Sequence, residues 1–270
     1  MVPVFYASIG FVLSEDRMCT LTLLRRPGHR WPLLVAANRD EMTDRPWDPP
    51  GRYWPDRPEV VAGRDRLAGG SWLGCNRHGV MAAILNREGS LGPSADKRSR
   101  GELVLEALDH ADAAAAAAAL RDIDPAAYRS FNLVIADNTD AFWLASRDGA
   151  DRMDCVEIPP GLAMLTSANL NDTSHARIGR YLPKFDAAPA PDPDAGDWSA
   201  WQKILACPTF DPSAGPSGAM CVATDYGYGT VSSSLIALAG AEQSSEDVAD
   251  IWLFAPGPPD SAAFAPVIIG

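Results

Sequence analysis

The chain has 270 residues and a formal net charge of −12. This acidic balance argues against a nucleic-acid partner, because affinity for a phosphate backbone depends on clustered Lys and Arg, and against adhesion to an anionic membrane surface. Hydrophobic residues make up 47% of the sequence and charged residues 21%, a composition typical of a globular protein with a sizeable core.

The N-terminal segment is mostly apolar over residues 2–13. No Lys or Arg precedes this run and no cleavage-site pattern follows it, so the sequence does not predict a signal peptide. The run is also too short to span a bilayer, and we expect no membrane insertion. We expect Met18 to be the more natural start, residues 1–17 to be an extension that packs poorly or lies extended, and residues 18–270 to form one domain.

Short strands account for much of the chain. Strand-forming residues bounded by turn signals predict strands over residues 19–24, 33–37, 71–75, 80–86, 131–136, 141–145, 155–158, 162–166, 219–224, 230–237 and 250–254. Turn residues between neighbours join the first eight of these strands into four hairpins. Residues 45–58, rich in Pro, Trp and Asp, are expected to form an ordered loop.

Helical patterns separate the strands into groups. Ser99 and Glu102 have the spacing of a capping box, which predicts a helix with Leu103, Leu105, Ala107 and Leu108 on its apolar face. Further helices are predicted over residues 113–119, 174–182 and 198–206. Strands, helices and strands again predict an α+β fold with two mainly antiparallel sheets between helix layers.

The cysteines and histidines form no recognisable metal or disulfide pattern. None of the five cysteines belongs to a Cys-x-x-Cys pair, and the four histidines lack His-x-x-x-His spacing. We therefore expect no cofactor and a reducing, cytoplasmic compartment. Phosphate-loop, dinucleotide-binding and nucleophile-elbow motifs are absent as well.

The densest polar cluster, residues 38–46, follows the second predicted strand. A solvated loop with local ion pairs explains such a cluster, and so does the lining of a site at a strand end. The segment resembles the Asn-Arg-Asp-Glu-x-x-x-Arg-Pro signature of the NRDE family, the transport and Golgi organisation protein 2 family. Residues 62–65, 69–74, 99–104, 131–133 and 228–233 are similar to further family segments, in family order. One departure is Val231, where the family usually has Arg.

The resemblance implies an N-terminal-nucleophile hydrolase type of fold, a four-layer αββα sandwich. Family members typically begin Met-Cys, and the corresponding pair here is Met18-Cys19. Taken alone, Cys19 can be an ordinary small apolar strand residue, which is the more common role of a cysteine. If Met18 starts the chain and is removed, the thiol and the free α-amine of Cys19 become nucleophile and base on one residue.

The resemblance also implies roles for individual residues. Cys19 would attack a carbonyl carbon, Arg39 would stabilise the thiolate, and Asp40 would hold the α-amine. Asn86 and Asn169 would donate to the oxyanion, although a turn or strand-end role explains each equally well. The residues expected to bind substrate are Asn38, Glu41, Arg45, Trp72 and Ser232, with a core position as the alternative for Trp72.

The function implied is that of a cysteine amidohydrolase, thioesterase or acyltransferase with a small-molecule acyl substrate. The alternative is a non-catalytic protein of the same fold that binds or carries haem or a lipid-related ligand. A purely structural role receives less support, because the polar motifs gather at strand ends, where sites form. The sequence predicts no oligomeric state.

Overall fold

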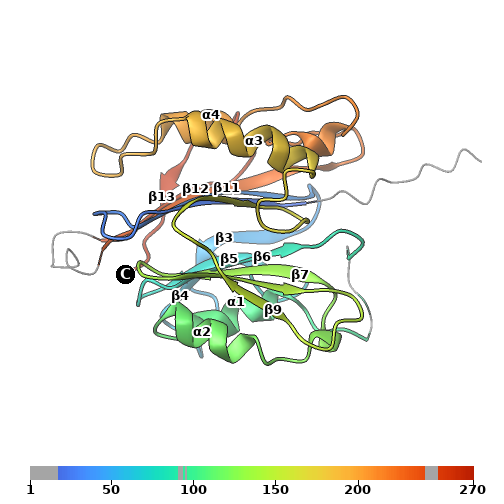
Figure 1. Cartoon of the computed structure of the whole chain (residues 1–270), viewed down its shortest axis with the longest axis vertical. Helices are drawn as coiled ribbons and strands as arrows, with labels where there is room; N and C mark the ends of the chain where they lie inside the picture. Colours follow the sequence, from blue (N-terminus) through green and yellow to red (C-terminus); the bar gives the residue numbers. More distant parts are fainter. Residues whose placement is uncertain (1–17, 91–93, 95, 241–248) are drawn as a thin grey trace, which may run out of the picture.

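The described part of the chain forms four layers. The computed structural model describes residues 18–90, 94, 96–240 and 249–270 (Figure 1). Two stacked sheets lie in the middle, one pair of helices covers the outer face of the first sheet, and a second pair covers the outer face of the second (Figure 1). The expected extension over residues 1–17 lies outside the described residues.

The first sheet contains the first strand of the described chain, which lies next to an edge strand of that sheet. Its strands are, in spatial order, β10 (Gly161–Leu165), β1 (Thr20–Arg25), β2 (Leu33–Met42), β11 (Tyr228–Leu238), β12 (Ile251–Ala255) and β13 (Ala265–Pro266). All neighbours are antiparallel. The predicted hairpin of β1 and β2 is confirmed, with Thr20 opposite Asn38.

The second sheet is a meander in chain order. Its strands are β3 (Trp47–Gly51), β4 (Val60–Asp65), β5 (Leu73–Asn76), β6 (Met81–Asn86), β7 (Phe131–Ala136), β8 (Ala141–Ser146) and β9 (Asp154–Glu157). The β5–β6 and β7–β8 hairpins are confirmed. Sequential antiparallel pairing is the arrangement that tight turns between strands predict.

The helices cover the outer faces of the sheets. The described helices are α1 (Gly101–Leu108), α2 (Ala113–Leu120), α3 (Ala176–Ala187) and α4 (Ser199–Leu205), with short 3-10 turns at Pro125–Ala127 and Pro216–Gly218. Helices α1 and α2 pack on the second sheet, and α3 and α4 on the first. The four predicted apolar residues of α1 are all buried.

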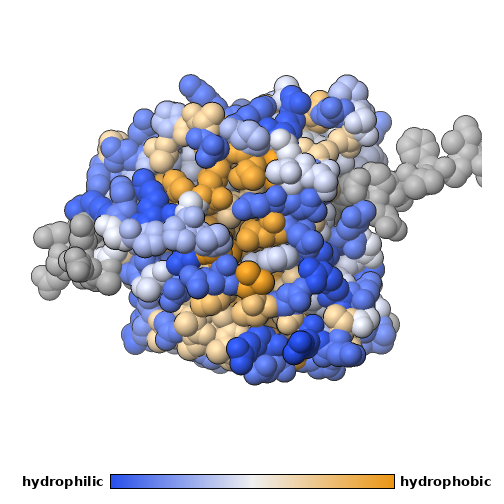
Figure 2. All heavy atoms as spheres, in the orientation of Figure 1, coloured by the Kyte–Doolittle hydropathy of each residue, from blue (hydrophilic) through white to orange (hydrophobic). Residues whose placement is uncertain are grey.

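Three apolar clusters hold these layers together. One lies between the sheets, a second lies between the second sheet and α1 and α2, and a third lies between the first sheet and α3 and α4. Side chains alternate along each strand, so Val35 of β2 joins the inter-sheet cluster while Leu34 and Ala36 join the third. On the face drawn in Figure 2, hydrophilic residues surround apolar residues that gather near the centre.

The predicted hairpin of residues 155–158 and 162–166 is wrong. Strand β9 belongs to the second sheet and β10 to the first, so the chain crosses between the sheets here. Pro159 and Pro160 cannot donate ladder hydrogen bonds, and Ile158 is fully buried between the sheets. Burial of that isoleucine outweighs the local turn signal.

Three other local predictions also fail. Residues 45–58 contain edge strand β3, a position that tolerates Pro49 and Pro50 because one side needs no donors. Residues 219–224 form no strand but only an isolated bridge from Ala223 to Gly229 of β11. Helix α1 begins without a side-chain cap, and Glu102 binds Arg98 instead of closing a capping box.

Among the described residues, none of the helices combines the length and apolar character that a membrane crossing requires.

Truncation of a β7 side chain in the cluster between the second sheet and its helices should destabilise the fold. Leu133 is 0% exposed there, and Leu133→Ala should lower the free energy of unfolding by about 2–5 kcal/mol. Leu67 is 67% exposed, and Leu67→Ala should change it by no more than about 0.5 kcal/mol. Denaturant unfolding measures both, and equal effects would contradict the burial of β7.

Candidate active site

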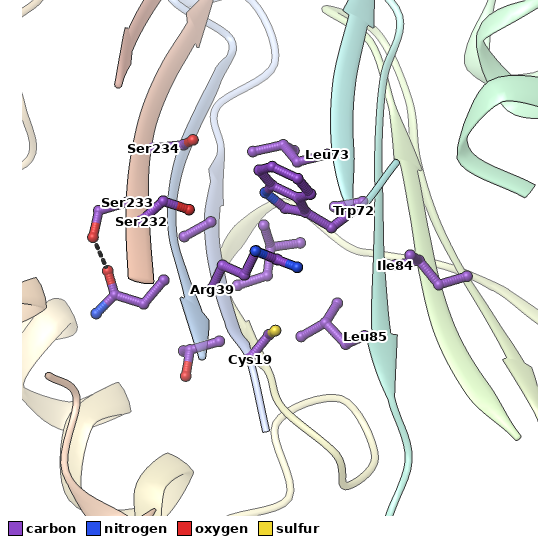
Figure 3. Close-up of a pocket in the computed structure, with 14 residues that line it drawn as sticks. Cys19, Arg39, Trp72, Leu73, Ile84, Leu85, Ser232, Ser233 and Ser234 are labelled. Atoms are coloured by element: carbon purple, nitrogen blue, oxygen red, sulfur yellow. Dashed lines mark hydrogen bonds between the residues drawn. The ribbon is translucent and has the colours of Figure 1, made fainter. Parts of the chain in front are cut away.

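Cys19 lies immediately before β1 and faces the space between the two sheets (Figure 3). Its side chain is half-buried, and its Sγ lies 3.7 Å from the backbone oxygen of Asp40 on β2. Residues of both sheets line a pocket around it: Thr20, Leu21, Ala37, Asn38, Arg39, Ser232, Ser233 and Ser234 from the first, and Trp72, Leu73, Ala83, Ile84 and Leu85 from the second. The first sheet therefore supplies the polar side, and the second supplies apolar walls.

Strand β2 runs longer than the sequence predicted and includes the polar signature. Residues 38–41 lie within the strand, not in a loop after it. Alternation along the strand places Arg39 between the sheets, whereas Asn38 and Asp40 face the helix layer. One short sequence thus serves both faces of the sheet.

Arg39 is the charged group that shares the pocket with Cys19. It is 6% exposed, and its guanidinium carbon lies 4.2 Å from the ring centroid of Trp72. Its Nη2 lies 3.8 Å from a carboxylate oxygen of Glu41, while Nη1 is buried without a hydrogen-bond partner among the described residues. The pKa of Arg39 is lowered, because burial outweighs the raising effects of the neighbouring Cys19 and Glu41. The guanidinium has a donor to spare for a ligand.

The remaining charges of the signature continue outward from this point. Arg45 lies 3.6 Å from Glu41 and 2.6 Å from Asp65 of β4. Glu41 and Arg45 are both partly exposed. They form a rim of alternating charge at the outer side of Arg39.

Trp72 is held in place by a glycine of the neighbouring strand. A Cβ at Gly63 would lie 2.3 Å from the Trp72 ring, so only glycine fits there. Trp72 is half-buried and also packs edge-on against Trp47, with ring centroids 5.8 Å apart. The ring covers Arg39, lines the pocket and packs against the apolar cluster between the sheets, so the alternative of a core position also fits.

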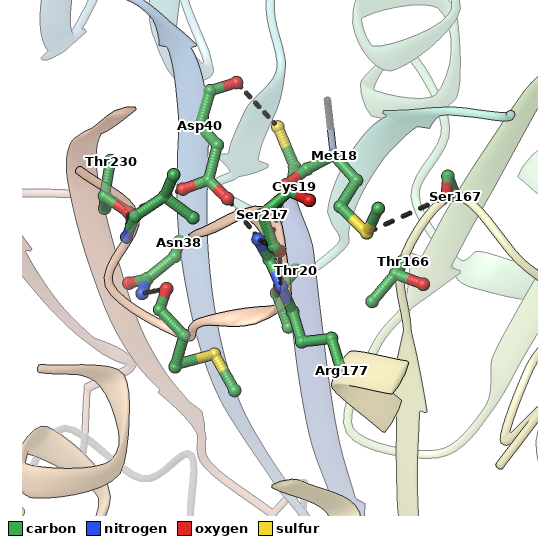
Figure 4. Close-up of polar contacts among 12 residues, drawn as sticks. Met18, Cys19, Thr20, Asn38, Asp40, Thr166, Ser167, Arg177, Ser217 and Thr230 are labelled. Carbon is green, nitrogen blue, oxygen red and sulfur yellow. Dashed lines mark hydrogen bonds and ion pairs between the residues drawn. The ribbon is translucent and has the colours of Figure 1, made fainter. Parts of the chain in front are cut away.

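Asp40 belongs to a buried polar network on the helix face of β2 (Figure 4). Arg177 of α3 donates from Nη1 to its carboxylate at 2.8 Å, and Thr230 donates to the other oxygen at 2.6 Å. Both Asp40 and Arg177 are 0% exposed at their side chains. The pKa of Asp40 is raised, because burial outweighs the lowering effects of the Arg177 charge and of the hydrogen bonds from Thr230 and Arg177.

A β-bulge turns Thr230 toward Asp40. The register of β11 against β2 shifts between Thr230 and Ser232. Ser232 and Ser234 line the inter-sheet pocket, so regular alternation would send Thr230 the same way. The bulge re-aims its hydroxyl to the helix face.

The side chain of Asn38 is fully engaged on the helix face. Its amide donates to the backbone oxygens of Leu205 and Met220, and its oxygen accepts from Ser233. Asn38 thus ties β2 to α4 and to β11. Asn38 is also among the residues that line the pocket, and its predicted role in substrate binding stays a prediction.

Neither predicted oxyanion donor lines the Cys19 pocket. Asn86 ends β6, and because Ala83 and Leu85 face the pocket, alternation turns Asn86 toward the α1 side. Asn169 is exposed, and its side-chain oxygen accepts from Arg87 and Arg147. The oxyanion role of each asparagine stays a prediction from the sequence.

Arg177 is the site residue that the sequence analysis missed. It lies among apolar residues of α3 on the face that packs against the first sheet, with Ile178, Tyr181 and Phe185 buried beside it. A charged residue on an otherwise apolar helix face was the available signal. No three or more His, Cys, Asp or Glu side chains gather as a metal site in the described ranges.

The thiol is not ionised while Met18 precedes it. Burial, and then the charge of Asp40, raise the pKa of Cys19 to about 12, against the opposing effect of Arg39. All five cysteines are unpaired. Chemistry at Cys19 therefore needs a base to remove its proton.

Comparisons with known proteins agree on family and fold. The model of the family described as Transport and Golgi organisation 2 matches residues 18–245. The Transport and Golgi organization protein 2 homolog of Homo sapiens is 34% identical over 110 residues, which are 39% of this chain and 38% of that protein. The Mus musculus homolog is 40% identical over 77 residues, 27% of this chain and 26% of that protein. These alignments thus span well under half of the curated relatives.

Solved structures resemble the whole described architecture. Penicillin V acylase from Agrobacterium tumefaciens has a TM-score of 0.50 at 14% identity, covering 88% of this chain and 83% of that one. The Caenorhabditis elegans N-acylethanolamine-hydrolyzing acid amidase ortholog has a TM-score of 0.52 at 12% identity, covering 81% and 92%. The expected N-terminal-nucleophile hydrolase fold, an α+β sandwich, is confirmed.

The raised pKa of Cys19 can be tested in the full chain. At pH 8, iodoacetamide should modify Cys19 at least about tenfold more slowly than the exposed Cys155, because only the thiolate reacts. Peptide mass spectrometry over a time course measures both rates in one sample. Equal rates at the two cysteines would contradict a buried, protonated thiol.

Proposed function

This chain belongs to the Transport and Golgi organisation 2 family, and we propose that it is a cysteine hydrolase of the N-terminal-nucleophile type, acting on the carbonyl of an amide or thioester. Cys19, once N-terminal, is the nucleophile. The reaction needs no cofactor. The unpaired cysteines favour a reducing, cytoplasmic compartment.

One observation carries the proposal. The Cys19 thiol faces the pocket beside the buried Arg39, while the peptide group before it touches the Asp40–Arg177 pair through the Met18 oxygen, 3.0 Å from Arg177. A charged group therefore flanks this residue on each face of the first sheet, with Arg39 on the thiol side and the Asp40–Arg177 pair on the other.

The reaction follows from these positions. The α-amine takes the thiol proton, and the thiolate attacks the carbonyl carbon to form a tetrahedral adduct. The amine then returns the proton to the leaving nitrogen or sulfur, and the acyl group remains on Cys19 as a thioester. Water, deprotonated by the amine, cleaves this thioester and releases a carboxylic acid. With an alcohol or amine in place of water, the same step transfers the acyl group.

Named side chains support this chemistry. Arg39 stabilises the thiolate, and its unpartnered Nη1 is a donor that the pocket offers to the oxyanion. Asp40 holds the α-amine. Asn86 and Asn169 are additional donors proposed from the family resemblance alone.

The full chain is a dormant form in this proposal. With Met18 attached, the nitrogen of Cys19 is an amide, which cannot accept the thiol proton, and the thiol keeps a pKa of about 12. The family match begins at Met18, one residue before the proposed nucleophile, which supports release of Cys19. Removal of Met18 supplies the missing base.

The pocket favours an apolar acyl group. Leu73, Ala83 and Leu85 form its wall on the second sheet, with Trp72 beside Arg39. Glu41, Arg45 and Ser232 are proposed to contact the polar part of the substrate. The two solved neighbours are named as an acylase and an amidase, so N-acyl amides are the first class to screen.

Substitution of the nucleophile should abolish turnover. In a chain that begins at Cys19, Cys19→Ala should lower kcat/KM at least about a thousandfold. Cys207→Ala is the matched control, because Cys207 packs on the helix side of the first sheet, and its activity should equal that of the parent chain. Hydrolysis of N-acyl amides and acyl thioesters, followed by mass spectrometry, measures the effect.

Retention of residues 1–18 should abolish activity as well, and intact-mass analysis of the natural product establishes where it begins. Full activity of Cys19→Ala would reject the proposal. A chain that begins at Cys19 and turns over no acyl substrate would favour the alternative from the sequence, in which the same fold binds or carries haem or a lipid-related ligand. Absorption during a haem titration tests that alternative.

A further inference from the structure

We propose that Arg177 is a positioning residue, which keeps the α-amine of Cys19 unprotonated by pairing with Asp40. The inference rests on the proposed function, because it concerns the base of that same reaction. It concerns α3, which carries no residue of the sequence-predicted site. Arg177 acts through Asp40 and not on the substrate.

Arg177 contacts the residues on both sides of Cys19 in the chain, and it also contacts Asp40. Its Nη1 lies 2.6 Å from the Thr20 hydroxyl, 2.8 Å from Asp40 Oδ2 and 3.0 Å from the Met18 oxygen. Its Nε donates to the Ser217 oxygen at 3.1 Å, which fixes the plane of the guanidinium. The nitrogen of Cys19 belongs to the same peptide group as the Met18 oxygen, which accepts from Arg177. Figure 4 shows Met18, Cys19, Asp40 and Arg177 gathered in this region.

The hydrogen bonds of Nη1 fit the released chain better than the full chain. A guanidinium Nη carries two hydrogens, but three acceptors lie within hydrogen-bond distance of Nη1. Loss of Met18 removes one acceptor and leaves Thr20 and Asp40. The two hydrogens of Nη1 then have two acceptors, and no third acceptor competes for them.

Arg177 supplies the positive charge that balances the carboxylate of Asp40. A buried carboxylate needs a positive partner. Without Arg177, the α-amine would take its place as the positive partner, because it is a stronger base than a carboxyl group. It would hold a proton as an ammonium ion paired with Asp40, and its lone pair could not accept the thiol proton. With Arg177 present, Asp40 already has its counter-charge.

Other ionisable groups around this point do not replace Arg177. On β2, Arg39 turns to the opposite face and lies beside Glu41. His175 precedes α3 and lies 3.5 Å from the Thr166 hydroxyl. Further groups whose charge is felt at Cys19 or Asp40 are Arg100 at the start of α1, Tyr228 on β11 and Cys221 before it. Burial keeps Tyr228 and Cys221 neutral, and Arg100 binds the backbone oxygens of Ser90 and Ser130.

The test measures the amine directly and does not depend on catalysis. The full chain is prepared as Cys19→Ala, with a site-specific protease sequence ending at residue 18, and is cleaved after folding to expose the amine of residue 19. The pH dependence of its acetylation by acetic anhydride, followed by mass spectrometry, gives the pKa of that amine. Arg177→Gln should raise this pKa by about one unit or more.

The matched control is Arg180→Gln on the same helix. Arg180 binds the Thr209 hydroxyl, so this variant should leave the amine pKa unchanged. Arg177→Lys keeps the charge and should also leave it near that of the parent. An unchanged pKa in folded Arg177→Gln would overturn the proposal.

Loss of a buried ion-pair partner destabilises a fold, so a second variant covers the case in which Arg177→Gln does not fold. Asp40→Asn removes the carboxylate and leaves the positive charge of Arg177, which should lower the amine pKa by about one unit. An unchanged or raised pKa in Asp40→Asn would overturn the proposal independently. Because the amine is titrated without the thiol, an absent hydrolase activity would leave this result interpretable.

Discussion

The alternation of side chains along β2 is the constraint on which the site depends. This strand lies between β1 and β11 and has apolar clusters on both faces, so its polar residues Asn38, Arg39 and Asp40 are buried and need partners. Asn38 and Asp40 find complete sets of partners on the helix face. Arg39, on the other face, retains a donor without a partner among the described residues. The incomplete position is the one that shares a pocket with a thiol.

The two sheets contribute differently to that pocket. The first sheet places Cys19 and Arg39 on adjacent hydrogen-bonded strands, which fixes their separation through backbone pairing. The second sheet contributes shape, since Gly63 leaves room for the Trp72 ring that covers Arg39. Two family segments distant in the sequence therefore meet through one cation–aromatic contact. At β11, Val231 provides no charge, and the guanidinium paired with Asp40 comes from α3 instead.

Local sequence signals predicted the elements whose environment is local. The β5–β6 and β7–β8 hairpins follow from turn residues between strand-forming runs, and the α1 face follows from leucine spacing. The crossing at Pro159 and Pro160 could not be predicted, because a hairpin and a change of sheet share the same turn signal, and only burial of Ile158 between the sheets decides. Cys19, Arg39 and Trp72 could be placed in a site by family resemblance, but the side of β2 facing the thiol required the register. The apolar surroundings of Arg177 on α3 were a signal, but its partner could not be predicted, since the contact with Asp40 spans 137 residues.

A buried ion pair is poor evidence of stability, and this bears on why Arg177 and Asp40 are present. Well-packed apolar residues of similar volume often serve a core as well or better, because both charges must be desolvated. The pair lies at the edge of the apolar cluster that binds α3 to the first sheet, where such a replacement would fit. The pair also adjoins the peptide bond between Met18 and Cys19, whose cleavage would expose an amine beside a thiol. A charge pair that fixes the protonation of that amine has a use that apolar side chains could not supply. The free energy spent on desolvating the two charges then serves to keep a base active at neutral pH.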